Sequence, residues 1–217
     1  MPIQKSLYAA LIDLTGEHVL VVGGGKVAAR KVASLLDAGA QVTVVSPKYA
    51  PEFAALGHRC NLVRREFKTM DLKRQKLVFA VTDDVELNTE IANTAKRREL
   101  LVNVAAPAEA GNMFVPAKFK RGRLQVSISS GGASAAVSKT IRRRLERALG
   151  TEWGTLIELL EARRTRLKSE ITDPTERRRL FRALGSSKWA RMIRDEGAAK
   201  TEEAIEKTIA KAKAVKR

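Results

Sequence analysis

The sequence has few of the residues that build disulfides and metal centres. Its 217 residues include one cysteine, Cys60, and two histidines, His18 and His58. An internal disulfide is therefore impossible, and no thiolate cluster can hold a metal. Long apolar runs are also lacking: none approaches the roughly 18–20 residues that span a bilayer, and the N-terminus carries no signal-peptide pattern. We therefore expect a cytoplasmic protein with no metal site and no membrane partner.

Aromatic residues make up only 5% of the chain, and acidic residues are few relative to basic ones, above all in its second part. Residues 1–115 hold 15 basic and 12 acidic residues, whereas residues 116–217 hold 26 and 12, a net charge of +14. This second part should attract a polyanion, such as a nucleic acid, an acidic membrane surface or a polycarboxylate, unless the charge serves only solubility. No aromatic stacking platform or known motif supports nucleic acid as the partner.

Short apolar runs alternate with helical stretches through the first hundred residues. The runs that predict strands are 18–22, 41–46, 61–67, 76–81 and 100–104. Helical apolar spacing predicts a helix over 26–36 and another over about 85–98. Such alternation indicates an α/β fold, a Rossmann-like doubly wound parallel sheet covered on both faces. After Val104 the pattern changes to a turn at 120–122, a strand at 123–129, a basic helix at about 135–149 and an all-helical remainder.

A glycine-rich turn joins the first expected strand to the first expected helix. The run Gly-Gly-Gly-Lys-Val-Ala fits the strand–GxGxxA–helix pattern of a dinucleotide site. In this pattern Gly23 permits the tight turn, Gly25 lets the backbone approach a pyrophosphate, and Ala28 allows close packing of helix on strand. The helix N-terminus offers its N–H groups to the phosphates. The predicted cofactor contacts here are Gly23, Gly25, Lys26, Val27 and Ala28.

The acid that usually ends the second strand of such folds is absent. Ser46-Pro47-Lys48 stands there instead, and we expect all three to contact the cofactor. A carboxylate would bind the ribose and repel a 2′-phosphate. Ser46 can still donate to a hydroxyl, and Lys48 can tolerate the phosphate, so this position leaves NAD and NADP both open.

Two further segments carry polar groups at positions where a ligand could bind. Thr82 follows the fourth strand and is the expected cofactor contact there, with Asp83 or Asp84 as the cap of the next helix. A loop of serines and glycines precedes the basic helix and can cup an anion, or else it is a connector with Ser134 as helix cap. No Ser/His/Asp set accompanies this loop, so nucleophilic catalysis is unsupported.

Several segments together resemble the NAD-dependent precorrin-2 dehydrogenases, including the dehydrogenase/ferrochelatase modules of sirohaem synthases. They cover about residues 7–149 in order, as DLTGEHVLVVGGGKVAARKVASLLDAGAQVTVVSP, FAVTDDVELN, LLVNVAAP, FVPA and RGRLQVSISSGGASAAVSKTIRRRLE. The resemblance implies a Rossmann domain over 1–112, a dimerisation segment over 113–150 and a helical domain over 151–217, in an intertwined homodimer.

The resemblance also implies a reaction. NAD would remove hydride from precorrin-2, a tetrapyrrole ringed by carboxylates, to give sirohydrochlorin, and some members then insert ferrous iron. Arg and Lys of the cationic part suit those carboxylates. We expect Asn103 to contact the cofactor. The expected substrate contacts are Ser129, Ser130, Gly131, Gly132 and Arg142.

One departure from the family pattern concerns proton handling. The family's NVVD motif carries an aspartate thought to serve proton transfer and chelation, and Ala106 occupies that position here. A methyl group can neither take a proton nor contact a metal. Glu109 and Asp84 are the candidates to replace it. Hydride transfer relies mainly on positioning, so we expect dehydrogenation to survive and ferrochelatase activity to suffer more.

Two other interpretations remain open. A catalytically silent relative would bind NAD and the tetrapyrrole without turnover. A regulatory nucleotide-sensing domain, like those governing potassium channels, also combines a glycine loop with paired aspartates and a following asparagine. Such domains usually keep an acid at the end of the second strand, where this chain has Ser46, and they lack the FVPA and SISSGG segments.

Overall fold

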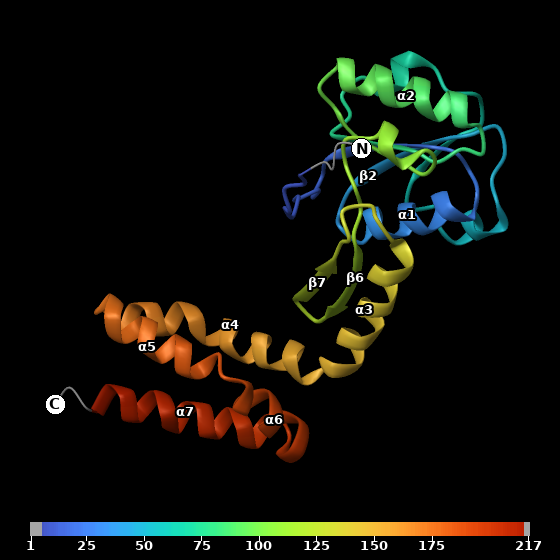
Figure 1. Ribbon diagram of the computed structural model, residues 1–217. Helices are drawn as coiled ribbons and strands as arrows, with labels where there is room; N and C mark the ends of the chain where they lie inside the picture. The colour runs from blue at the N-terminus through green and yellow to red at the C-terminus, as the bar shows by residue number, and fades with distance from the viewer. Residues whose placement is uncertain (1–5, 215–217) are drawn as a thin grey trace. The chain divides into compact units, whose positions relative to one another are not determined.

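A computed structural model describes residues 6–214 of the chain. The chain folds as two compact units, a first unit that ends at Val115 and a second unit that begins at Pro116 (Figure 1). Among the described residues, no helix combines the length and the apolar character needed to cross a membrane.

A parallel five-stranded sheet forms the centre of the first unit. Its strands are β1 (His18–Val22), β2 (Gln41–Val45), β3 (Asn61–Val63), β4 (Leu77–Ala80) and β5 (Leu101–Val104). Their order in the sheet is β3-β2-β1-β4-β5. This order confirms the predicted Rossmann-like fold, and it places the switch point, where such sheets bind ligands, between the carboxyl ends of β1 and β4. The third strand is shorter than expected, because the chain turns at Arg65, whose N–H donates to Val63 O.

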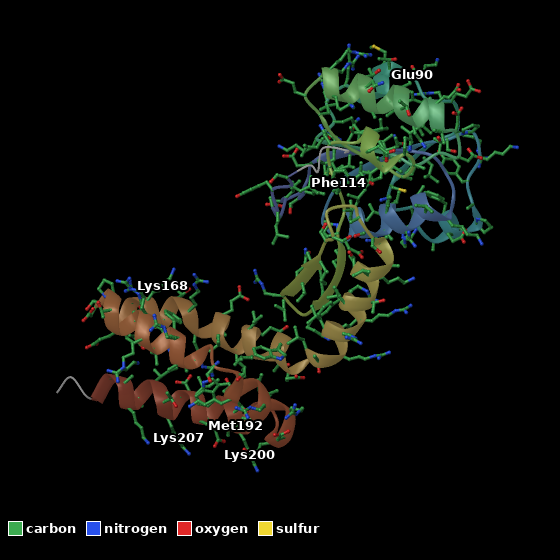
Figure 2. The ribbon with its side chains drawn as sticks, viewed as in Figure 1. Glu90, Phe114, Lys168, Met192, Lys200 and Lys207 are labelled. Carbon is green, nitrogen blue, oxygen red and sulfur yellow. The ribbon has the colours of Figure 1, made fainter. Side chains whose placement is uncertain are left out.

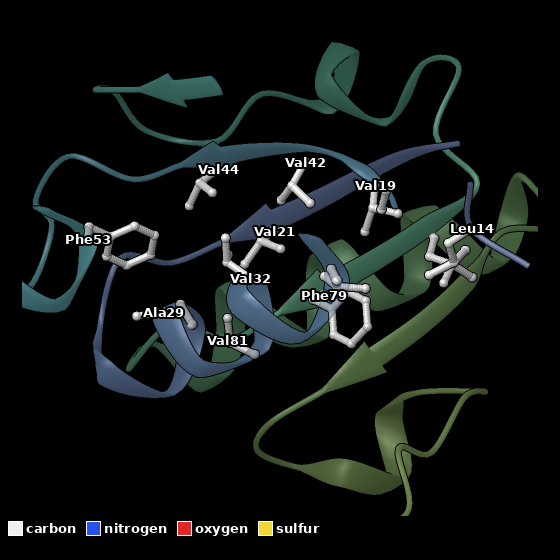
Figure 3. Packing of buried hydrophobic residues seen from close by; sticks show 14 residues of the cluster. Leu14, Val19, Val21, Ala29, Val32, Val42, Val44, Phe53, Phe79 and Val81 are labelled. Atoms are coloured by element: carbon white, nitrogen blue, oxygen red, sulfur yellow. The ribbon is translucent and has the colours of Figure 1, made fainter. Parts of the chain in front are cut away.

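Helices cover both faces of this sheet. Val19 and Val21 of β1 pack toward α1 (Lys26–Leu36) with Val32 and Phe79, as Figure 3 shows. The alternate residues of β1 join a second apolar cluster with α2 (Val85–Arg97). Because both faces are buried, the strands read as continuous apolar runs rather than alternating ones. Three short 3-10 turns complete the first unit: η1 (Pro51–Ala55), η2 (Thr69–Leu72) and η3 (Ala108–Ala110).

The second unit begins with an antiparallel hairpin of β6 (Ala117–Arg121) and β7 (Leu124–Ile128). The sequence predicted only the second of these strands. β6 was missed because Phe119 is its one large buried side chain, so no alternation of apolar residues marks it. Five helices follow: α3 (Ala135–Ala148), α4 (Glu152–Glu170), α5 (Pro174–Leu184), α6 (Ser187–Glu196) and α7 (Ala198–Ala214).

A cluster of charges joins α4 to α7 above their shared apolar core. The Arg163 side chain is 9% exposed, and its guanidinium binds Glu202 at 2.5 Å and Glu206 at 2.7 Å. Arg166 binds Glu206 as well, at 2.8 Å. Partial burial acts to raise the pKa of Glu206, but the hydrogen bonds from Arg166 and Arg163 outweigh it and hold the pKa below its ordinary value of 4.5. A carboxylate of this kind stabilises the fold above that pH and loses its contribution as the pH falls further.

We expect Arg163→Met to lower the free energy of unfolding of the second unit by about 1–3 kcal/mol, since two acids then lose a charged partner. Both glutamates are partly exposed and can rehydrate, which keeps the effect below that of a fully buried pair. Urea titrations at pH 7 and pH 3 measure this effect, because the contribution of Glu206 is lost below its ordinary pKa of 4.5. The wild type should lose stability between these two values and the variant should lose less. An equal loss in both proteins would show that this cluster does not couple folding to pH.

Candidate functional site

A cavity of about 1010 Å³ lies at the carboxyl edge of the sheet in the first unit. It is lined by the glycine turn after β1, by the segments after β2, β3 and β4, and by the first turns of α2. The lining residues are 22–27, 45–50, 66–67, 81–84, 86, 87 and 90. The cavity therefore occupies the switch point at which doubly wound sheets bind their ligands.

The three glycines of the turn are required for different reasons. Gly23 has a φ of +117°, and a Cβ there would lie 2.6 Å from Val81 O. A Cβ on Gly24 would lie 2.0 Å from Lys48 O, so this glycine allows the segment after β2 to pack on the turn. A Cβ on Gly25 would meet no atom within 4 Å. Gly23 and Gly24 thus shape the turn, whereas Gly25 faces open space that a ligand can fill.

The N-terminus of α1 lacks the side-chain cap that many helices have. No side chain caps this helix, and its first turn holds no acid. By contrast, Asp84 caps α2 by accepting from Leu87 N at 3.0 Å, which confirms its predicted capping role. The free N–H groups of a first helical turn suit an anion. The residues present therefore fit the diphosphate of a dinucleotide. Ala28 is fully buried and packs the helix on the sheet, as expected.

The residues after β2 line the cavity but use part of their polar capacity within the protein. Ser46 is 7% exposed, and its hydroxyl donates to Lys48 O at 2.7 Å. Its hydrogen is thus committed, and only the oxygen lone pairs of Ser46 are left for a ligand. Lys26 lies at the start of α1, and its Nζ is 3.7 Å from Glu52 Oε1 in an exposed ion pair.

A buried asparagine ties together the loops after β4 and β5. Asn88 is fully buried, and its Oδ1 accepts from the backbone N–H of Thr82 at 3.1 Å and from the Thr82 hydroxyl at 2.8 Å. Its Nδ2 donates to Thr82 O and to Ala106 O, both at 3.1 Å. The Thr82 hydroxyl, expected to meet the cofactor, therefore serves this network. The sequence marked Asn88 only as an asparagine following two aspartates and did not assign it a role.

We expect Asn88→Ala to lower the free energy of unfolding by about 2–3 kcal/mol, because it removes a fully buried side chain that bonds the partly buried backbone groups of Thr82 and Ala106. Asn93→Ala is the matched control, since Asn93 is exposed on the same helix. It should change the stability by less than about 0.5 kcal/mol. Chemical denaturation followed by circular dichroism compares the two. Equal effects would contradict the role of Asn88 in holding the two loops.

Asn103, the other predicted cofactor contact, does not line the cavity. Its Oδ1 accepts from Lys31 Nζ at 2.8 Å, and its Nδ2 donates to Met113 O at 3.0 Å. Lys31 also lies 5.3 Å from the centre of the Phe79 ring. Burial lowers the pKa of this lysine, and the neighbouring charge of Arg30 lowers it further. The Asn103 amide thus links α1 to the segment that leaves β5.

The position of the family aspartate and its two candidate replacements all lie in the first unit. Ala106 is exposed, and its carbonyl is held by Asn88. Asp84 lines the cavity, but its carboxylate already accepts the backbone hydrogen bond that caps α2. Glu109 lies in η3, three residues after Ala106, and is exposed. Their part in proton transfer remains a prediction.

The predicted substrate contacts lie in the second unit. The Ser130 hydroxyl accepts a hydrogen bond from the backbone N–H of Ser134 and donates one to the Ser134 carbonyl oxygen, both at 2.9 Å. Ser129 Oγ accepts from the backbone N–H of Gly131 at 3.1 Å. Ser134 caps α3 by accepting from Val137 N, as one reading of the sequence predicted. Gly131 and Gly132 both have positive φ angles. Arg142 pairs with Glu146 on the same helix. The loop is therefore an ordered turn whose hydroxyls already have partners, and its role in substrate binding remains a prediction.

Within residues 6–214 no group of three or more His, Cys, Asp or Glu side chains could hold a metal ion. The cavity of the first unit combines a glycine turn, an uncapped helix N-terminus and a switch-point position. These features together define a nucleotide-binding protein of the Rossmann class.

Three family models match the chain in succession. They are described as putative NAD(P)-binding (residues 10–117), sirohaem biosynthesis protein central (121–148) and sirohaem synthase dimerisation region (152–209). The chain belongs to this family of sirohaem biosynthesis proteins. The dimerisation model matches the helical part, whereas the resemblance in sequence implied a dimerisation segment over 113–150. The expected domain boundaries remain predictions.

Curated relatives and one solved structure extend this result. Siroheme synthases of Chromobacterium violaceum and Mannheimia succiniciproducens are 37% and 33% identical to the chain, over 94% and 87% of its length. The chain spans 44% and 40% of the length of these two relatives. A structure described as SirC, precorrin-2 dehydrogenase, is 28% identical, has a TM-score of 0.74, and is covered over its whole length by 93% of the chain.

Proposed function

We propose that the chain oxidises precorrin-2 to sirohydrochlorin, with NAD⁺ as the hydride acceptor. The single observation that carries this proposal is the open space at Gly25, beside an uncapped helix N-terminus, in a chain that covers all of a known precorrin-2 dehydrogenase. When bound, the nicotinamide ring supplies the site for hydride. The backbone N–H groups of Lys26 and Val27 hold the diphosphate, and Gly23 and Gly24 keep the turn in the shape that exposes them.

The second unit provides the charge that a polycarboxylate substrate needs. Residues 116–217 carry a net charge of +14. Arg143, Arg144 and Arg147 are exposed on α3, whereas Arg142 is paired with Glu146. Guanidinium groups bind carboxylates bidentately, so exposed arginines of α3 are better placed than Arg142 to meet acetate and propionate groups. We infer a homodimer as the working form, in line with the dimerisation region that the chain matches.

The site lacks the carboxylate that the family uses for proton transfer. Ala106 offers no carboxylate where the family aspartate stands. The protons that leave the macrocycle must therefore pass to water or to another acid, for which Glu109 and Asp84 are the candidates. General acid–base help is typically worth about 10²–10⁴-fold, so its loss slows the reaction without abolishing it. Chelation needs proton removal as metal enters, and we infer that ferrochelatase activity is the more impaired of the two.

Mixing the purified protein with precorrin-2 and NAD⁺ tests the proposal. NADH and sirohydrochlorin should form in equal amounts, and no product should form when the coenzyme is omitted. Tetrapyrrole binding without turnover would favour the second candidate, a catalytically silent relative, which the alanine at 106 supports. Binding of the dinucleotide but not of the tetrapyrrole would favour a regulatory nucleotide sensor. Sedimentation of the protein tests the homodimer, and the cytoplasmic location remains a prediction.

A further inference from the structure

The choice between NAD and NADP is not explained by the residues that usually make it. An acid at the end of β2 normally binds the ribose hydroxyls and repels a 2′-phosphate. Here Ser46-Pro47-Lys48 occupies that position. The Lys48 side chain is exposed, and it lines the cavity with a positive charge. These three residues alone would therefore admit the phosphorylated coenzyme as well as NAD.

The end of the neighbouring strand supplies the missing negative charge. β3 pairs with β2 in parallel, with Val63 opposite Val45. The backbone N–H of Ser46 donates to Val63 O at 3.2 Å, so the two strands leave the sheet side by side. Glu66 follows β3 by three residues and lines the same cavity as Pro47 and Lys48. Glu66 therefore brings a carboxylate to this cavity from the strand that neighbours β2.

The two arginines before Glu66 are directed elsewhere. The Arg64 guanidinium lies 5.5 Å from the centre of the Tyr49 ring. Arg65 binds both carboxylate oxygens of Asp71, at 2.8 and 2.6 Å. Neither arginine is among the residues that line the cavity. A nearby arginine is the usual partner of a 2′-phosphate, and here the cavity lining includes Glu66 but neither of the arginines beside it.

The cavity lining as a whole holds more acidic than basic side chains. Lys26 and Lys48 are its basic lining residues. The acidic ones are Glu66, Asp83, Asp84, Glu86 and Glu90. Figure 2 shows Glu90 on α2. A cavity with more acids than bases tolerates one diphosphate at the helix N-terminus but disfavours an additional phosphate.

We propose that Glu66 takes the place of the absent β2 acid, accepting a hydrogen bond from a ribose hydroxyl and repelling a 2′-phosphate, and so selects NAD⁺ over NADP⁺. The inference rests on the proposed function, because it assumes that the cavity holds the dinucleotide. Glu66 acts here as a specificity residue and has no part in hydride or proton transfer.

Calorimetric titration of NADH and NADPH into the wild type, Glu66→Gln and Glu90→Gln tests this role. Glu66→Gln removes the charge and keeps the size of the side chain, and its position is exposed, so the fold should be unaffected. We expect the wild type to prefer NADH and the ratio of the two dissociation constants to fall about tenfold or more in Glu66→Gln. Glu90→Gln removes one cavity charge elsewhere and should change the ratio less than about threefold.

The outcomes separate this inference from the proposed function. An unchanged ratio in Glu66→Gln, or an equal change in both variants, overturns the role of Glu66 and leaves the dehydrogenase proposal intact. A preference of the wild type for NADPH overturns the inference as well and points to Lys48. A ratio that depends on Glu66 supports the inference even where precorrin-2 is not turned over, which contradicts only the proposed activity. Failure to bind either dinucleotide overturns both.

Discussion

Gly25→Ala is expected to weaken NADH binding about 100-fold, or about 2.7 kcal/mol, while the protein keeps its thermal stability. Gly25 has an ordinary backbone φ of −80°, and a Cβ built there meets no atom within 4 Å. The added methyl group is therefore harmless to the fold, but it occupies space beside the N–H groups of α1 that a diphosphate needs. Calorimetric titration and a thermal melt measure the two effects separately.

Gly24→Ala is the control for this experiment, because it adds the same methyl group one residue earlier. A Cβ at Gly24 would lie 2.0 Å from Lys48 O and 2.7 Å from Ser46 Oγ. Backbone must move to accept it, and we expect the free energy of unfolding to fall by about 2–4 kcal/mol. If Gly25→Ala bound NADH as tightly as the wild type, or melted as early as Gly24→Ala, the assignment of Gly25 to the ligand would be wrong.

Ala106→Asp is expected to raise the rate of precorrin-2 oxidation by a factor between about 10² and 10⁴, the usual worth of general acid–base help. Ala106 is exposed, and its carbonyl already accepts from Asn88, so the backbone that would carry the new carboxylate is held in place. Sirohaem formation with ferrous iron should rise as well, since chelation also needs a proton acceptor. Initial rates of NADH and sirohaem formation provide the measurement.

Ala106→Asn separates proton transfer from any other effect of a larger polar side chain. It has the shape of aspartate but no basic oxygen at neutral pH. Its rates should stay near those of the wild type, and only the aspartate variant should gain a new acid limb in its pH profile. An Ala106→Asp protein with an unchanged or lower rate would show that this chain does not handle protons at position 106.

Much of the first unit could be predicted because its signals are local. The strands are short apolar runs, and the helix caps are single residues such as Asp84 next to the helix they begin. The glycine turn was recognisable for the same reason, since a strand, three glycines and a helix follow one another directly. The boundary of β3 was less certain, because its end depends on a turn at Arg65 and not on hydropathy.

The individual side chains of the candidate site were harder to predict than the site itself. Ser46 and Thr82 lie at the cavity as expected, yet their hydroxyls bond to Lys48 O and to Asn88. Asn103 was expected at the cofactor and instead joins α1 to the segment after β5. Lys31 is far from Asn103 in the chain, and even the nearer partners Lys48 and Asn88 meet these hydroxyls only when their loops have folded. Sequence spacing therefore does not show whether a polar group is free.

By itself, the sequence determined the class of fold, the place of the dinucleotide turn and the division of charge between the two parts. Periodicity and turn chemistry involve only residues that are close together in the chain, and composition does not depend on contacts at all. Only the tertiary structure decided which of several adjacent charges face a ligand. Arg65 and Glu66 are neighbours in the chain, yet the first binds Asp71 and the second lines the cavity. That choice depends on contacts between segments, which form only when the sheet brings the ends of its strands together.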